Sequence, residues 1–448
     1  MESIPTLTAH VFAALAAIVL VASVFGRIAV LLRQPRVVGE MVAGVLMGPS
    51  LLGWLLPDVQ EALFPAEVRP ALYLLSMIGL VFFMFLVGAG IRHGVLDRRS
   101  TRGALSVGVV GVVVPLALGV TVAWALADQI SDPGTPRLQV SLLLGGALTV
   151  TAFPMLARIL NERGMQSSRL GAVTLLAASV DDAAAWIVLA VILALAFGGS
   201  MAGVAASLVG VAVFTVVMLK LAPRLLAPIA RSVERNGHLT PGALAVVVLL
   251  ILGAAWTTHE LGIHFVFGGF IVGISLPASP ALRECVRNRL MDMNVGLLLP
   301  VFFIYTGLNT DLGGLVSGSA LLAVIAITAV AFIGKYLSCL FVMRALGHSW
   351  RVASAAGGLM NARGLMVLIF INIGLEHGVL SQDLFSILVL VAVVTTVAAL
   401  PIYRLSLPDS LEAAERLDTA DPDPEPEPAT PPREAREKEA ETAMANEP

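Results

Sequence analysis

The chain has 448 residues, of which 57% are hydrophobic and only 13% are charged, and its mean hydropathy is +0.90. A soluble domain carries about a quarter charged residues, so this composition excludes an ordinary soluble protein and indicates a chain that crosses a membrane many times. The net charge of −3 is unevenly divided, because 13 acids and 4 bases lie from Asp409 onward, leaving 18 acids and 24 bases before that residue.

Windows of about 20 residues predict thirteen apolar helices. Residues 1–10 lack the basic stretch of a signal peptide, so we expect the first helix to remain in the mature protein. The two cysteines, Cys285 and Cys339, form neither a disulfide framework nor a metal-binding pattern. The predicted helices lie at about 9–32, 37–56, 71–91, 104–127, 138–160, 169–197, 201–222, 241–258, 262–278, 293–309, 317–344, 351–375 and 384–404.

The positions of the basic residues test this count. Loops and helix ends after the odd-numbered helices hold 19 lysines and arginines, whereas those after the even-numbered helices hold only Arg69 and Arg137. Basic residues accumulate on the cytoplasmic side of membrane proteins. The alternation therefore predicts an N-terminus outside and a C-terminus in the cytoplasm.

The fifth predicted helix, "LLLGGALTVTAFPMLARIL", contains features that interrupt helices. Pro154 lacks an N–H and disturbs the preceding turn, which frees a carbonyl near Val150. Thr151 lies just before it and adds a hydroxyl oxygen. Oxygen atoms of this kind are hard ligands that suit alkali ions.

The sixth predicted helix contains "AASVDDAAAW", in which Asp181 and Asp182 are the only ionisable residues between Leu170 and Met201. A charge at the centre of a membrane helix costs about 2.5–3.5 kcal/mol, so two unpaired aspartates would cost about 5–7 kcal/mol. Lys335, in the eleventh helix, is the obvious counter-charge. Neighbouring residues on a helix point about 100° apart, so only one aspartate is expected to face the lysine.

Two explanations of this cluster remain open. A structural ion pair would simply hold two helices together. Two acids opposite one base, however, leave one negative charge unmatched, which favours a mobile ion such as a proton or a metal cation. We therefore prefer a functional site.

The twelfth predicted helix, "AAGGLMNARGLMVLIF", has Asn361 and Arg363 in the middle of an apolar run. Like the fifth helix, it begins with a glycine pair and has polar residues four to six positions later. Interrupted helices at corresponding places in two halves of a chain indicate a transporter site. Arg363 is either the ion partner of an acid such as Glu376 or a charge that faces an aqueous cavity, and we favour a supporting role over direct transport.

The final segment, residues 407–448, is rich in proline, alanine and acidic residues and has few large apolar side chains. Such a composition cannot bury enough surface to fold. We therefore predict a disordered acidic cytoplasmic tail after a membrane domain formed by residues 1–406.

Four segments together resemble the monovalent cation:proton antiporter family two, in particular its bacterial and plant cation/proton exchangers. They are "TAFPMLARIL", "AASVDDAAAW", "FIGKYLSC" and "GGLMNARGLMVLI", and the resemblance extends over about residues 10–405. It implies a homodimer with a dimerisation domain and a mobile core formed by about residues 104–197 and 317–404. On these residues we expect a member without the cytosolic nucleotide-binding domain of the related potassium efflux systems and with a shorter tail than that of the plant exchangers.

The resemblance also implies roles for individual residues. Asp182 is expected to bind the cation and the proton, and Asp181 to pair with Lys335, beside a crossing of the two broken helices at Thr151. The combination of two aspartates and a lysine implies electrogenic exchange.

Together these observations predict an all-α polytopic membrane protein with inverted repeats, in a bacterial inner membrane. We expect it to exchange Na⁺ or K⁺ for protons by alternating access and to contribute to pH homeostasis. We expect no cofactor beyond the transported ions and no nucleic-acid partner. The alternative is a gated K⁺ efflux pathway on the same scaffold. An enzyme is disfavoured because the chain has no histidine-rich cluster and no Cys/His ligand spacing.

Overall fold

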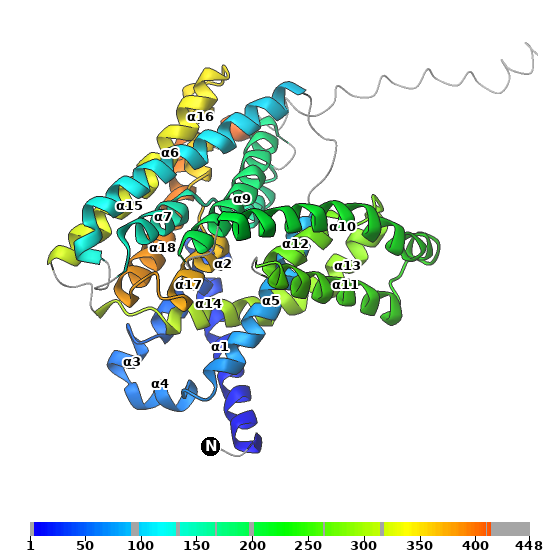
Figure 1. Cartoon of the computed structure of the whole chain (residues 1–448), viewed down its shortest axis with the longest axis horizontal. Coiled ribbons are helices and arrows are strands. Elements are labelled where there is room, and N and C mark those ends of the chain that lie inside the picture. Colours follow the sequence, from blue (N-terminus) through cyan, green and yellow to red (C-terminus); the bar gives the residue numbers. More distant parts are fainter. Residues whose placement is uncertain are drawn as a thin grey trace, which may run out of the picture.

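The computed structural model describes residues 4–90, 98–130, 135–165, 168–196, 201–262, 265–313, 318–408 and 410–413. Every regular element within these ranges is a helix, and each of the thirteen predicted segments contains a helix or a pair of helices (Figure 1). Nine of the described helices are long and apolar enough to cross a membrane. The other four segments are the two interrupted ones, the sixth and the short ninth. The prediction of an all-α polytopic membrane protein is therefore confirmed.

The helices pack in two groups. The broken-helix group contains α6 (Arg98–Ile130), α7 (Arg137–Thr149), α8 (Phe153–Glu162), α9 (Arg169–Ala196), α15 (Gly318–Ala345), α16 (Trp350–Leu359), α17 (Leu365–Glu376) and α18 (Gln382–Ser406). The scaffold group contains α1 (Ile4–Leu31), α2 (Arg36–Met47), α3 (Leu52–Leu55), α4 (Pro57–Leu63), α5 (Arg69–Gly90), α10 (Met201–Asn236), α11 (Pro241–Glu260), α12 (Val266–Ile274), α13 (Pro280–Met293), η1 (Asn294–Leu298) and α14 (Leu299–Leu308). The groups meet mainly where α2 contacts α18 and where α9 leads into α10.

Two of the predicted helix boundaries are wrong. The seventh helix continues to Asn236 as α10, and the tenth is preceded by α13, so the arginines placed in two loops lie on helices. At the start of α13, the hydroxyl of Ser279 accepts a hydrogen bond from the Leu282 amide, and Pro280 occupies the first turn, where its missing N–H costs nothing. Hydropathy marks where a helix leaves the apolar layer, not where it ends.

Contacts between loops support the predicted alternation of membrane faces. Arg283, after the ninth predicted helix, donates from Nη1 to the Ala89 carbonyl at the end of the third, at 2.8 Å. Ser381, after the twelfth, donates to the Ile130 carbonyl at the end of the fourth, at 3.1 Å. The ends of odd-numbered predicted helices thus contact one another, and the ends of even-numbered predicted helices do the same. We call the side with the odd-numbered ends the basic face.

The predicted tail begins too early in the chain. Leu407 is buried and Leu411 packs against the same apolar cluster. Glu412 is fully buried and forms an ion pair with Arg163, with Oε2 2.5 Å from Nη2. These residues belong to the folded part because two leucines bury apolar surface and the acid has a basic partner. Residue 409 and residues 414–448 lie outside the described residues.

Close backbone contact between α2 and α14 requires glycine at two positions. A Cβ atom added to Gly307 would lie 1.9 Å from the Gly44 carbonyl carbon, and one added to Gly44 would lie 2.2 Å from the Phe303 oxygen. Both contacts are far inside van der Waals distance, and their neighbours are backbone atoms that cannot rotate away. The scaffold group therefore depends on two helices that approach at glycine.

We expect Gly307→Ala to lower the melting temperature of the purified protein, because separating the two helices costs about 1–3 kcal/mol. Gly253→Ala in α11 is the matched control, since nothing lies within 4 Å of its added Cβ. Thermal unfolding in detergent measures both variants. Equal melting temperatures for the two would contradict the packing described for α2 and α14.

Candidate functional site

Two helices are interrupted at the centre of the broken-helix group. The backbone between α7 and α8 is not helical at residues 150–152, and that between α16 and α17 is not helical at residues 360–364. Pro154 is the second residue of α8, a position where proline is tolerated. The two broken helices run in opposite directions, because they are the fifth and the twelfth predicted helices, one odd-numbered and the other even-numbered.

The interruptions cross and bond to each other. The Thr151 hydroxyl donates to the Met360 carbonyl at 2.7 Å, and the Ala152 amide donates to the Ala362 carbonyl at 3.0 Å. Backbone groups without a partner are costly inside a membrane, so each break supplies partners for the other. The crossing therefore places two helix N-termini and two helix C-termini close to one point.

Asp181 and Lys335 form a fully buried ion pair beside this crossing. Asp181 Oδ2 lies 2.6 Å from Lys335 Nζ and accepts a second hydrogen bond from the Thr151 amide at 2.9 Å. Lys335 Nζ also donates to the carbonyls of Gly111, at 2.8 Å, and Thr149, at 2.5 Å. The ammonium group thus meets the C-terminus of α7, where the helix dipole is negative. This network connects α6, α9 and α15 to the first break.

Asp182 has a different environment, although it is the next residue of α9. Its side chain is only 2% exposed, yet neither carboxylate oxygen has a hydrogen-bond partner among the described residues. The carboxylate lies near the Phe153 amide at the N-terminus of α8, outside hydrogen-bond geometry. The positive end of a helix dipole favours an anion there. The arrangement presents two acceptor oxygens that a proton or a small cation can occupy.

Arg363 links the second break to its surroundings through carbonyl groups. It is 1% exposed and donates to the carbonyls of Ala147, at 3.1 Å, and Ala331, at 2.8 Å. Its own carbonyl accepts a hydrogen bond from the Thr396 hydroxyl. Among the described residues, Arg363 therefore donates to backbone carbonyls of α7 and α15 and not to Glu376.

The burial of Arg363 changes the charge count made from the sequence. The centre of this group holds two acids and two bases, so its formal charge is balanced when all four are ionised. The balance is uneven in space, because Lys335 pairs with Asp181 whereas Arg363 bonds to carbonyls. The four side chains together therefore carry no net charge, but one carboxylate, that of Asp182, has no hydrogen-bond partner among the described residues.

Asn361, the remaining predicted residue of the crossover, is buried within the second break. Its Nδ2 donates to the Gly357 carbonyl at 3.0 Å, and its Oδ1 has no hydrogen-bond partner among the described residues. The contacts that sequence reasoning missed are backbone carbonyls, those of Gly111, Thr149 and Met360. Residue type carries no signal for them, because every residue has a carbonyl.

Known proteins resemble this chain over most of its length. The family model for the transmembrane sodium/hydrogen exchanger matches residues 15–403. The Na⁺/H⁺ antiporter NhaS4 of Synechocystis sp. is 39% identical over 372 residues, which cover 83% of this chain and 90% of that protein. K⁺/H⁺ antiporter 1 of Saccharomyces cerevisiae is 30% identical over 400 residues, which cover 88% of this chain but 46% of the yeast protein. This chain thus spans less than half the length of the yeast relative.

A solved structure supports the fold. The sodium proton antiporter MjNhaP1 of Methanocaldococcus jannaschii matches 92% of this chain and 99% of its own with a TM-score of 0.61, at 15% identity. The match to the family model covers nearly the whole helical part, including both broken helices, α9 and α15. The chain is an integral membrane protein that belongs to the transmembrane sodium/hydrogen exchanger family, a family of transporters rather than enzymes.

Proposed function

We propose that this protein exchanges a monovalent cation, Na⁺ or K⁺, for protons across the membrane. The observation that carries the proposal is the buried Asp182 carboxylate, which has no hydrogen-bond partner among the described residues and lies beside the crossing of two broken helices. The names of the Synechocystis and yeast relatives, a Na⁺/H⁺ and a K⁺/H⁺ antiporter, agree with exchange of this class.

Coupling follows from competition for one carboxylate. A proton neutralises Asp182 covalently, whereas a cation neutralises it electrostatically and also needs oxygen ligands to replace its hydration shell. The carboxylate and the nearby broken backbone supply such ligands. Both ions cannot occupy the same oxygens at once, so arrival of one releases the other.

Transport also requires that the site open to each side in turn. We propose that the broken-helix group moves relative to the scaffold group and carries the loaded site with it. An empty, ionised Asp182 is the least favourable state to move through an apolar surrounding, because its charge has no local partner. Only the loaded site then crosses, which links the two fluxes.

Asp181 and Lys335 add a second group that can release a proton during the cycle. When a cation binds at Asp182, its positive charge weakens the adjacent pair and favours loss of a proton from Lys335. More than one proton then moves for each cation, and exchange is electrogenic. We further propose that the protein is a homodimer in a bacterial inner membrane, with the basic face towards the cytoplasm.

Proteoliposomes containing the purified protein test this function. A gradient of Na⁺ or K⁺ should drive proton movement, reported by a pH-sensitive dye, with Li⁺ as a third ion and the measurement repeated across pH. Clamping the membrane potential should change the initial rate if net charge moves. Cation flux without proton counterflow would instead favour a gated efflux pathway.

A further inference from the structure

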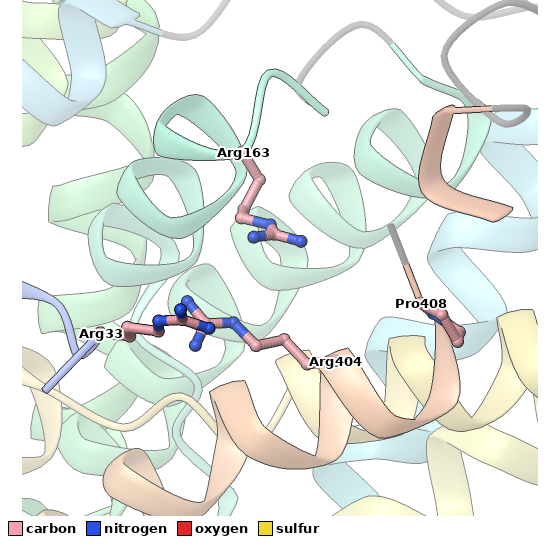
Figure 2. A pocket seen from close by; sticks show the side chains of 4 residues that line it. All are labelled: Arg33, Arg163, Arg404 and Pro408. Atoms are coloured by element: carbon pink, nitrogen blue, oxygen red, sulfur yellow. The ribbon is translucent and has the colours of Figure 1, made fainter. Parts of the chain in front are cut away.

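A cavity on the basic face lies between the two helix groups. Its volume is about 550 Å³ and its lining consists of Arg33, Arg163, Arg404 and Pro408. Figure 2 shows the three guanidinium groups directed into the same space. Arg33 follows α1 of the scaffold group, whereas Arg163 follows α8 and Arg404 lies in α18, both of the broken-helix group. A ligand in this cavity would therefore touch both groups.

Next to the cavity, one hydrogen bond already joins the two helix groups directly. Gln34, the neighbour of Arg33, donates from Nε2 to the Val397 carbonyl of α18 at 3.3 Å. Three guanidinium groups around one space repel each other and attract an anion, and Arg binds carboxylates in a bidentate geometry. The cavity is thus suited to carboxylate groups.

The chain itself brings a carboxylate to this place. After α18 the backbone passes Pro408, which lines the cavity, and reaches Glu412 four residues later. The fully buried Glu412 carboxylate accepts hydrogen bonds from Arg163, at 3.1 Å from Nε and 2.5 Å from Nη2. One acid of the C-terminal segment thus already binds one arginine of the cavity.

The sequence that follows supplies more acids of the same kind. Residues 421–428 read "DPDPEPEP", with four acids and no base. Asp421 lies eight residues beyond Ala413, and eight extended residues span at most about 26–29 Å, so the run can return to the cavity. Proline restricts its neighbours to extended conformations, so binding this run loses less backbone entropy than binding a flexible one.

We propose that residues 421–428 dock in this arginine cavity and slow transport. Glu412 already binds Arg163, so the acidic run bridges Arg33 of the scaffold group and Arg404 of the broken-helix group. The two groups are then held together, which opposes their relative movement. The docking does not depend on the proposed exchange activity, whereas its effect on rate does. The two are therefore measured separately.

The backbone conformation at Arg33 makes Arg33→Gly a suitable variant for testing this docking. Arg33 has φ +58°, a left-handed conformation that glycine adopts without strain. Arg33→Gly removes one guanidinium from the cavity and suits this backbone, so the variant should fold. The matched control is Arg287→Gln on α13, which removes an exposed arginine away from the cavity.

Docking is measured by photocrosslinking in the full-length protein, in liposomes. With p-benzoylphenylalanine in place of Pro424, crosslinks identified by mass spectrometry should fall in residues 28–36, 159–165 and 400–408. Arg33→Gly should lower their yield about fivefold, as expected for one charge pair, and Arg287→Gln should leave it unchanged. High salt should lower it as well, because ions screen charges of this kind.

The effect on transport is measured with the acids neutralised. The combined variant Asp421→Asn, Asp423→Asn, Glu425→Gln and Glu427→Gln should exchange faster than the unchanged protein, as should Arg33→Gly. Crosslinks elsewhere, or a yield that Arg33→Gly leaves unchanged, would overturn docking. Crosslinks that vanish when anionic lipid is added would assign the cavity to lipid head groups. If docking is observed but the variants exchange at the unchanged rate, the proposed effect on transport is wrong. If neither the unchanged protein nor any variant shows exchange, the result counts against the proposed function alone.

Discussion

Replacing Asp182 with asparagine is expected to abolish cation/proton exchange while leaving the protein folded. The amide has nearly the same shape as the carboxylate, and Asp182 has no hydrogen bond to lose among the described residues. The asparagine amide, however, cannot take up a proton at neutral pH and has no negative charge to bind a cation. Both fluxes should therefore disappear together, which a dye-based assay in everted membrane vesicles measures.

The matched control for this change is Asp311→Asn. Asp311 is exposed, and its Oδ1 accepts a hydrogen bond from the Gly313 amide at the end of α14, far along the chain from both breaks. We expect this variant to exchange at the normal rate. An Asp182→Asn protein with a normal melting temperature and normal exchange would exclude Asp182 as the shared site for both ions.

Replacing Lys335 with methionine is expected to be among the most destabilising single changes in the chain. The methionine fills most of the space, but it leaves the buried Asp181 without its cation and the carbonyls of Gly111 and Thr149 without their donor. Removing one partner of a buried ion pair costs about 3–5 kcal/mol. The melting temperature in detergent should fall accordingly.

A double variant measures the interaction between Asp181 and Lys335 apart from the contacts that each makes with other groups. Adding Asp181→Asn to Lys335→Met removes the stranded charge, so the double variant should be more stable than Lys335→Met alone. Residues in one ion-pair network show coupling energies of about 0.5–3 kcal/mol, and we expect a value in the upper part of that range. Lys220→Met on α10, an exposed position, should have little effect. Additive changes at positions 181 and 335 would contradict the importance of the pair.

The same variants test the proposed charge movement. If Lys335 contributes a proton to each cycle, the exchange that survives in the double variant should become electroneutral. Clamping the membrane potential would then no longer alter its initial rate. Continued dependence on the potential would show that net charge moves without the lysine.

Much of the fold could be predicted because the membrane imposes simple rules. A bilayer requires long apolar segments, and basic residues gather on one face, so hydropathy and charge together gave the helix positions and the alternation of faces. The candidate site was equally visible in outline, since Asp181, Asp182, Lys335 and Arg363 are ionisable residues in segments that otherwise exclude charge.

Other features depended on groups that sequence patterns do not reveal. Helix geometry required that the two aspartates point in different directions, but it did not say which one meets the lysine. In the structure the Thr151 amide and the Lys335 ammonium meet on Asp181, which leaves Asp182 near the N-terminus of α8. Arg363 illustrates the same limit, because its partners are carbonyls of α7 and α15, and every residue carries a carbonyl.

The sequence by itself determined the membrane class, the helix positions, the two interrupted helices and the charged residues among them, because solvation by lipid acts on each segment separately. The family resemblance implied the pair of Asp181 with Lys335 and the crossing at Thr151. Only the tertiary structure decided which backbone groups join the two breaks, what surrounds Asp182 and where the C-terminal segment begins to pack. It also brought Arg33, Arg163 and Arg404 around one cavity. These features bring together residues up to 371 positions apart in the chain, which no local pattern encodes.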